Sequence, residues 1–259
     1  MGYPQGVIRA DPLNQRAINL CQELMAHLKP EDIPAELCVV LGGDGYLLKV
    51  ISELSSEFTY LGLNAGHLGF MLNEVSDIAG VAEKIKAASY TVREVPRLEV
   101  VAEDMDGSTF VGTALNDAYM ERMTGQTSHL RVVVDGVTVV ERMSCDGIIA
   151  ATALGSTAYS FSAGGPACHP SVRVIQLTTI CPHRPKLPPI TLPPQAVIEV
   201  EVIDGHRRPT RVVVDGVDHD NVLKVRITEH PAEIRMAWLE GHNPTANLIR
   251  KLVLPFSDR

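Results

Sequence analysis

Gly42-Gly43-Asp44-Gly45 combines residues that can bind phosphate with one that can accept a proton. The motif lies between a wholly apolar run, Leu37 to Leu41, and a segment whose apolar residues have helical spacing. Glycine can adopt positive φ, so successive backbone N–H groups can point into one concavity, and a helix that begins there adds further free N–H groups. Gly42, Gly43 and Gly45 are therefore expected to bind phosphate groups.

Asp44 is the unusual residue of this turn, because a carboxylate repels a phosphate group. Its presence is explained if the site also receives a metal ion, or if a substrate hydroxyl must lose its proton there. The alternative is that Gly-Asp-Gly is only a tight turn between a strand and a helix. The four residues by themselves do not separate these two interpretations.

A second polar region combines Asn116 and Asp117 with a block from Gly155 to Gly165 that is rich in glycine, serine, threonine and alanine. An amide and a carboxylate together supply donors and acceptors for a sugar, and small residues let backbone approach a flat base closely. Tyr159 within the block can stack on a base, or be a half-buried structural tyrosine. The ordinary alternatives are a polar surface loop for the block and a turn aspartate for Asp117.

The elements that must position the glycine turn follow strand–helix–strand order. Short apolar runs at 37–41 and 60–63 predict buried strands. Asp11-Pro12 predicts the start of a helix with Ile18, Cys21, Met25 and Leu28 on one face, and Ser76 predicts the cap of another. This order predicts a parallel sheet with flanking helices.

From about residue 97 the pattern changes to short β-rich runs separated by turns. Arg-Val-Val-Val-Asp-Gly-Val occurs twice, at 131–137 and 211–217, and each Asp-Gly predicts a hairpin turn. The flanking residues differ, which favours two independent hairpins over a duplicated unit. We expect an α/β domain over 1–95, a larger β-rich domain over 96–240, and a C-terminal helix in 241–259 that packs back on the first domain.

Composition limits the possible classes of protein. The formal charge of −8 argues against a nucleic-acid binder, because phosphate backbones require concentrated Lys and Arg. No apolar run approaches the length of a membrane span, and the start of the chain does not resemble a signal peptide. The five scattered cysteines include no Cys-x-x-Cys and no spacing typical of a zinc site. We expect a reduced, cytoplasmic protein with no membrane or nucleic-acid partner.

Taken in order along the chain, these blocks resemble the NAD kinase family, within a superfamily that also includes diacylglycerol kinases and phosphofructokinases. The resemblance covers about residues 37 to 216. Its blocks are Gly42–Gly45, Asn64–Phe70, Ala114–Asp117, Asp146–Pro170, Ile180–His183 and Asp215-Gly216.

The resemblance implies transfer of a phosphoryl group from ATP, or from polyphosphate, to the 2′-hydroxyl of the adenosine ribose of NAD. It implies Mg²⁺ or another divalent cation held mainly through the donor phosphates, with no metal ligand from the protein. A homodimer or homotetramer is also implied. By position, Asp44 matches the general base, and Asn116 and Asp117 match a pair that holds a ribose.

The remaining residues that the resemblance assigns to NAD binding contact other parts of the dinucleotide. Phe70 matches a residue beside the adenine, and Asp146 matches a carboxylate near the nicotinamide end. His129 falls where some members carry a contacting histidine. The positions that match contacts to adenine and ribose are Thr157, Ala158, Tyr159 and Ser162.

Four residues depart from the family pattern. Tyr46 stands where Thr is common, Leu154 where Thr is usual, Ser144 where some members have Arg, and Val217 where Gln is frequent. Two alternatives to NAD kinase therefore stay open. One is a lipid or other small-alcohol kinase that shares the glycine turn, and the other is a regulator that binds NAD(P) without catalysis.

Overall fold

The computed structural model describes residues 6–54, 57–66 and 69–253. They divide into two compact units, residues 1–95 with 233–259, and residues 96–232. Each unit is described by itself. His67 and Leu68 of the Asn64–Phe70 block, and residues 254–259 of the expected third segment, lie outside the described residues.

The first unit contains a five-stranded sheet with the order β1-β2-β3-β17-β4. Strands β1, β2, β3 and β17 run parallel, whereas β4 pairs antiparallel with β17. The prediction of an α/β part is confirmed in outline, with a mixed rather than a fully parallel sheet. The strands are β1 (Val7–Ala10), β2 (Leu37–Gly42), β3 (Thr59–Asn64), β4 (Tyr90–Val95) and β17 (Ile234–Leu239).

Helices cover both faces of this sheet. On one face, apolar residues of two helices, α1 and α3, pack with Val39 of β2 and with Leu61 and Leu63 of β3 in one core. On the opposite face, Leu47 of α2 and Leu72 lie against Gly62. The helices of this unit are α1 (Gln15–His27), α2 (Asp44–Leu54), α3 (Ile78–Lys86) and α5 (Pro244–Val253).

The first helix begins later than its sequence predicts. Asn14 is its N-cap, and the Asn14 side chain accepts hydrogen bonds from the N–H groups of Arg16 and Ala17. Asp11 instead accepts the N–H of Leu13 in a local turn. Leu24 is fully buried and Met25 is 56% exposed, so the predicted placement of Met25 was wrong.

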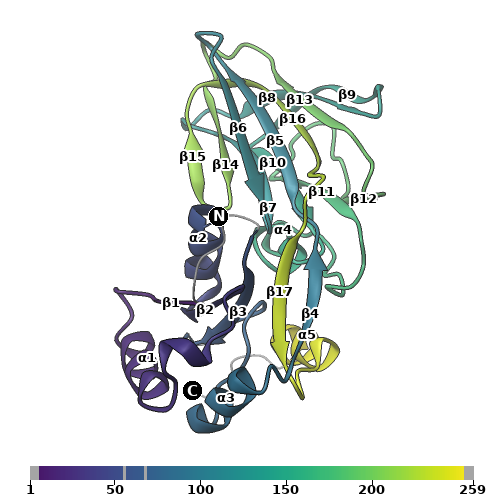
Figure 1. Ribbon diagram of the computed structural model, residues 1–259. Coiled ribbons are helices and arrows are strands. Elements are labelled where there is room, and N and C mark those ends of the chain that lie inside the picture. The colour runs from purple at the N-terminus through teal and green to yellow at the C-terminus, as the bar shows by residue number, and fades with distance from the viewer. Residues whose placement is uncertain (1–5, 55–56, 67–68, 254–259) are drawn as a thin grey trace. The chain divides into compact units, whose positions relative to one another are not determined.

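The expected boundary at residue 240 is corrected by β17. This strand pairs with β3 and β4 and therefore belongs to the first unit, although its residues 234–239 were assigned to the second domain. In Figure 1 the yellow β17 lies beside the blue β4. Pairing between strands so far apart in sequence leaves no local signal, because it depends on contacts with distant strands.

The second unit is a sandwich of two six-stranded sheets whose strand pairs are all antiparallel. One core joins residues of both sheets, including Met120 and Ile148 of the first and Val132 and Val200 of the second. The β-rich prediction is confirmed in outline. The first sheet has the order β12 (Ile190–Leu192), β11 (Ile175–Ile180), β10 (Gly147–Thr152), β7 (Asp117–Arg122), β14 (Thr210–Val214) and β15 (Val217–His219).

The second sheet completes the sandwich and supplies neither Asn116 nor the 155–165 block. Its order is β6 (Thr109–Ala114), β5 (Leu98–Asp104), β16 (Val222–Glu229), β13 (Ile198–Val202), β8 (Ser128–Val134) and β9 (Val137–Cys145). Among the helices that the structure describes, none has the length and apolar character needed to cross a membrane.

Candidate functional site

The glycine turn lies where β2 ends, beside the turn that follows β3. Because these strands are parallel, their carboxyl ends meet at one edge of the sheet. The N–H of Ala65 donates to the carbonyl of Gly42 at 2.9 Å. A β-carbon on Gly66 would come within 4.0 Å of the Gly43 Cα, so the two turns are direct neighbours.

The glycines of this turn do not adopt the positive φ that the sequence suggested. None of Gly42, Gly43 and Gly45 has a positive φ. Among the described residues, a β-carbon on Gly43 or Gly45 would meet no atom within 4 Å, whereas one on Gly42 would lie 2.9 Å from the Tyr46 ring. Gly43 and Gly45 thus leave the backbone accessible to a ligand, and the absence of a side chain at Gly42 leaves space for the Tyr46 ring.

Asp44 is the first residue of α2, and its carboxylate is held by the neighbouring loop. Its Oδ2 accepts the N–H of Phe70 at 2.7 Å and its Oδ1 accepts the N–H of Met71 at 3.1 Å. A negative charge is favourable at a helix N-terminus. These contacts fix the orientation of the carboxylate.

Three further residues shape this edge of the sheet. The Tyr46 hydroxyl donates to the Ala10 carbonyl at 2.9 Å, so this departure from the family pattern has a structural role. Asn14 donates to the carbonyl of Ala65, and the Arg16 guanidinium donates to the carbonyl of Gly66 at 3.3 Å. Arg16 therefore brings a cation beside the glycine turn, which was not predicted from the sequence because no motif includes it.

In the second unit, Asn116 and Asp117 lie against the start of the 155–165 block. A β-carbon on Gly155 would stand 2.0 Å from the Asn116 carbonyl oxygen, so only glycine fits there. The Thr152 hydroxyl donates to the Leu115 carbonyl at 2.6 Å and accepts the N–H of Gly155. The structure thus brings together two segments that are far apart in the sequence.

The polar atoms of this pair are poorly satisfied. Asn116 Oδ1 is buried without a hydrogen-bond partner among the described residues. Asp117 is 6% exposed, and burial, together with the negative charge of Asp215, raises the pKa of the Asp117 carboxyl to about 7. Burial also raises the pKa of Asp215 to about 6. An unsatisfied buried acceptor beside a buried carboxyl is suited to a ligand that donates hydrogen bonds.

A buried polar network holds the 155–165 block on β11. The Ser160 hydroxyl lies 2.9 Å from the Thr178 hydroxyl, and the Gln176 amide donates to the Pro166 carbonyl at 2.7 Å. Leu154, where the family pattern has Thr, is buried as an apolar side chain.

Four of the expected NAD contacts lie in this block, around the short helix α4 (Tyr159–Ser162). The Tyr159 ring packs edge-on against Tyr119 with centroids 4.9 Å apart. The Thr157 hydroxyl donates to the Leu154 carbonyl, and Ala158 is half-buried. Ser162 is exposed.

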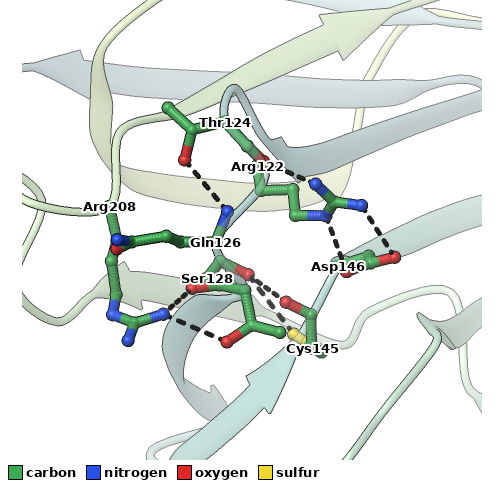
Figure 2. Close-up of polar contacts among 8 residues, drawn as sticks. Arg122, Thr124, Gln126, Ser128, Cys145, Asp146 and Arg208 are labelled. Atoms are coloured by element: carbon green, nitrogen blue, oxygen red, sulfur yellow. Dashed lines mark hydrogen bonds and ion pairs between the residues drawn. The ribbon is translucent and has the colours of Figure 1, made fainter.

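Asp146 lies at the other end of β7 and pairs with Arg122. The Arg122 Nε donates to Asp146 Oδ1 at 2.6 Å, and Figure 2 shows the fork of Arg122 facing this carboxylate. Asp117 and Arg122 are the first and last residues of β7, which is a separation of roughly 17 Å at the rise of a strand. A ligand that contacts both ends must therefore be long.

His129 is placed apart from these residues, in β8 of the second sheet. Its Nδ1 lies 2.9 Å from an Arg142 nitrogen and 3.8 Å from Asp204. Burial lowers the pKa of His129, and the nearby Arg208 and Arg142 lower it further. No hydrogen bond within the described residues joins the His129 side chain to the Asn116 region or to the 155–165 block.

The acidic and thiol side chains of the described residues do not form a metal site of their own. Within the residues that the structure describes, no group of three or more His, Cys, Asp or Glu side chains is arranged to hold a metal ion. Asp44 is the acidic side chain of the glycine turn. One carboxylate can supply at most a small part of the oxygen ligands that a divalent cation takes.

The chain is similar to known proteins in sequence. The family model for the ATP-NAD kinase C-terminal domain matches residues 115–232. An NAD kinase from Caulobacter vibrioides is 36% identical over 197 residues, which cover 75% of each chain. An NAD kinase from Cereibacter sphaeroides is 32% identical over 249 residues, covering 95% of this chain and 96% of the relative.

Two solved structures share the fold. Yeast NADH kinase complexed with NADH superposes with a TM-score of 0.79 at 22% identity, covering 98% of this chain and 89% of that chain. An NAD kinase from Archaeoglobus fulgidus in complex with ATP gives a TM-score of 0.74 at 24% identity, covering 95% and 96%. The sequence relatives, which match over most of their length, confirm the resemblance seen in the motifs: the chain belongs to the NAD kinase family.

Proposed function

We propose that this chain phosphorylates the 2′-hydroxyl of the adenosine ribose of NAD, giving NADP, with ATP as the donor. The proposal rests on the Asp44 carboxylate, whose orientation is fixed by hydrogen bonds from the N–H groups of Phe70 and Met71. Asp44 lies between Gly43 and Gly45, which leave the backbone accessible, and the chain is a member of this family. A hydroxyl is a poor nucleophile until its proton has an acceptor. Asp44 is that acceptor.

The first unit supplies the groups for the donor phosphates. Phosphoryl transfer depends mainly on positioning and on stabilising charge. Gly43 and Gly45 leave backbone open to phosphate oxygens, and the N-terminus of α2 is favourable for anions. Arg16 adds a positive charge beside the neighbouring turn.

The second unit supplies the groups for the dinucleotide. Asn116 and Asp117 hold the ribose hydroxyls, for which the buried Asn116 Oδ1 provides an acceptor. Tyr159 and the backbone at Thr157 and Ala158 contact the adenosine half. Asp146, at the far end of β7, contacts the nicotinamide half. Three further contacts rest on the family resemblance alone, namely Phe70, Ser162 and His129.

A divalent cation such as Mg²⁺ neutralises the donor phosphates when it is bound through them. Asp44 is the acidic residue of the glycine turn, and its carboxylate can orient such a cation. The cysteines are all free thiols, which supports a reducing compartment such as the cytoplasm. We propose a homodimer or homotetramer, which light scattering after gel filtration tests.

The direct test incubates the purified full chain with NAD, ATP and Mg²⁺ and measures NADP with an NADP-specific dehydrogenase. NADP formation is expected. ADP release with diacylglycerol but not with NAD would indicate a lipid kinase, and NAD binding without NADP would indicate a regulator. Parallel reactions with polyphosphate, and with NADH, define the donor and the acceptor.

A further inference from the structure

Asp215 uses one side chain to hold the backbone that carries Asn116 and Asp117. Its Oδ2 accepts the N–H of Leu115 at 2.6 Å, and its Oδ1 accepts the N–H groups of Asn116 and Asp117 at 3.0 and 3.2 Å. In return, the N–H of Asp215 donates to the Asp117 carbonyl at 3.1 Å. Three consecutive peptide groups are thus fixed by one carboxylate from a distant part of the sequence.

The hairpin turn between β14 and β15 brings Asp215 to this position. Asp215 and Gly216 both have positive φ, 44° and 85°, which is the conformation of a tight hairpin turn. Strand β14 pairs with β7 along its length, with Val214 opposite Ala118. The turn that follows Val214 therefore lies beside the residues that precede β7.

The chain contains a second copy of the same hairpin sequence, at 131–137. There Asp135 and Gly136 adopt the same turn, with φ of 49° and 76°. Asp135 accepts the N–H of Val197 at 2.8 Å, and its own N–H donates to the Val197 carbonyl. The two hairpins bind a neighbouring segment in the same way, but Asp135 holds one N–H before a core strand, whereas Asp215 holds three.

The side chains of Asn116 and Asp117 depend on this backbone support. In the described part of the chain, Asn116 Oδ1 has no hydrogen-bond partner and the Asp117 carboxylate accepts no hydrogen bond. Their direction is therefore set by the main chain from which they project. A shift of that main chain would move both side chains together.

We propose that Asp215 is a positioning residue for the acceptor nucleotide, acting through the backbone of residues 115–117. This inference rests on the proposed function. Asp215 does not contact the substrate in this proposal. Its carboxylate fixes where Asn116 and Asp117 present their side chains to the ribose.

The test compares Asp215→Asn with Asp135→Asn in the full chain. An amide keeps one acceptor oxygen but turns N–H donors toward backbone N–H groups, so Asp215→Asn loses at least one of the three hydrogen bonds. We expect the KM for NAD to rise about tenfold or more, while the KM for ATP stays within about twofold. Asp135→Asn is expected to leave both within about twofold.

Hydrogen–deuterium exchange of the peptide containing residues 115–117 supplies a readout besides activity. Exchange is expected to accelerate in Asp215→Asn and to stay unchanged in Asp135→Asn. If Asp215→Asn does not fold, Asp215→Ser, whose hydroxyl retains an acceptor, takes its place.

The inference is overturned if Asp215→Asn loses thermal stability but keeps the KM values of the wild type, or if both KM values rise equally. It is also overturned if Asp135→Asn has the same selective effect. The proposed function fails separately, when the wild-type chain forms no NADP. If the wild type forms NADP and the Asp215→Asn variant keeps the wild-type KM values, only the positioning role of Asp215 is contradicted.

Discussion

Gly155 lies so close to Asn116 that a β-carbon at position 155 would stand 2.0 Å from the Asn116 carbonyl oxygen. This contact joins the 155–165 block to the turn before β7. The Thr152 hydroxyl also links the two segments, because it donates a hydrogen bond to the Leu115 carbonyl and accepts one from the N–H of Gly155. The contacts proposed for Asn116, Asp117 and the 155–165 block thus depend on one packed junction.

Gly155→Ala is expected to force this junction apart. The backbone must shift to relieve the clash, at a cost of about 1–3 kcal/mol in stability. The KM for NAD should rise several-fold, with the KM for ATP little changed. Steady-state kinetics and thermal unfolding measure the two effects.

Gly125→Ala is the matched control, because a β-carbon there would meet no atom of the described residues within 4 Å. Its kinetics should match the wild type. Equal NAD affinity in Gly155→Ala and wild type would show that the junction does not position the dinucleotide contacts.

Asp117 should make NAD affinity depend on pH. Its pKa of about 7 means that the carboxylate, the stronger acceptor for a ribose hydroxyl, is present mainly above pH 7. We expect the KM for NAD to rise as pH falls from about 8 to 6, whereas Asp117→Asn should have a higher KM that changes less over this range. A wild-type KM that does not change would contradict the assignment of Asp117.

The same raised pKa values predict the pH dependence of stability. In the folded protein, the carboxyl groups of Asp117 and Asp215 bind a proton more tightly than in the unfolded chain, where their pKa is near 3.8. Stability from this source is complete below about pH 4 and is lost as pH rises through about 6 to 7. The contribution of Asp117 is at most about 4 kcal/mol.

Denaturant unfolding at pH 5 and pH 8 measures this contribution. Asp117→Asn should reduce the difference in unfolding free energy between the two pH values, whereas Asp220→Asn, at an exposed position before β16, should not. If Asp117→Asn shows the same difference in unfolding free energy between pH 5 and pH 8 as the wild type, another group is responsible for that difference.

Arg16→Ala is expected to weaken ATP binding. The Arg16 guanidinium lies beside the glycine turn through its hydrogen bond to Gly66, where it can attract donor phosphates. We expect the KM for ATP to rise about three- to tenfold, with the KM for NAD unchanged. The effect should shrink in high salt.

Arg93→Ala removes another cation of the first unit, one that lies over the Trp238 ring. Its KM for ATP should equal that of the wild type. If Arg93→Ala and Arg16→Ala raise the KM for ATP equally, the effect comes from the overall charge of the unit and not from a local contact between Arg16 and phosphate.

Local patterns predicted much of the fold. The apolar runs indicated β2 and β3 because a strand buried on both faces needs apolar side chains throughout. Asp135-Gly136 and Asp215-Gly216 indicated their hairpins because few residues adopt the required positive φ. Strand β7 has a weak local signal, because its apolar residues span only 118–120 and are followed by the charged Glu121 and Arg122.

Long-range contacts account for the parts that could not be predicted. The pairing of β17 with β3 and β4 depends on segments far away in sequence. The family resemblance marks Asp215-Gly216 but not what the Asp215 side chain binds, and the seven-residue segment that contains Asp215 is identical to the one that contains Asp135. What differs is the backbone that each carboxylate meets, which only the assembled fold determines.

The most direct test of the central claim is the rate of NADP formation by Asp44→Asn. An amide can still accept one backbone N–H but cannot take the proton of the ribose hydroxyl. We expect the turnover number to fall about 10²–10⁴-fold while the dissociation constant for NAD, measured by calorimetry, stays unchanged. Asp77→Asn, which alters a carboxylate that caps α3, should retain wild-type turnover. An Asp44→Asn enzyme that forms NADP at the wild-type rate would contradict the account.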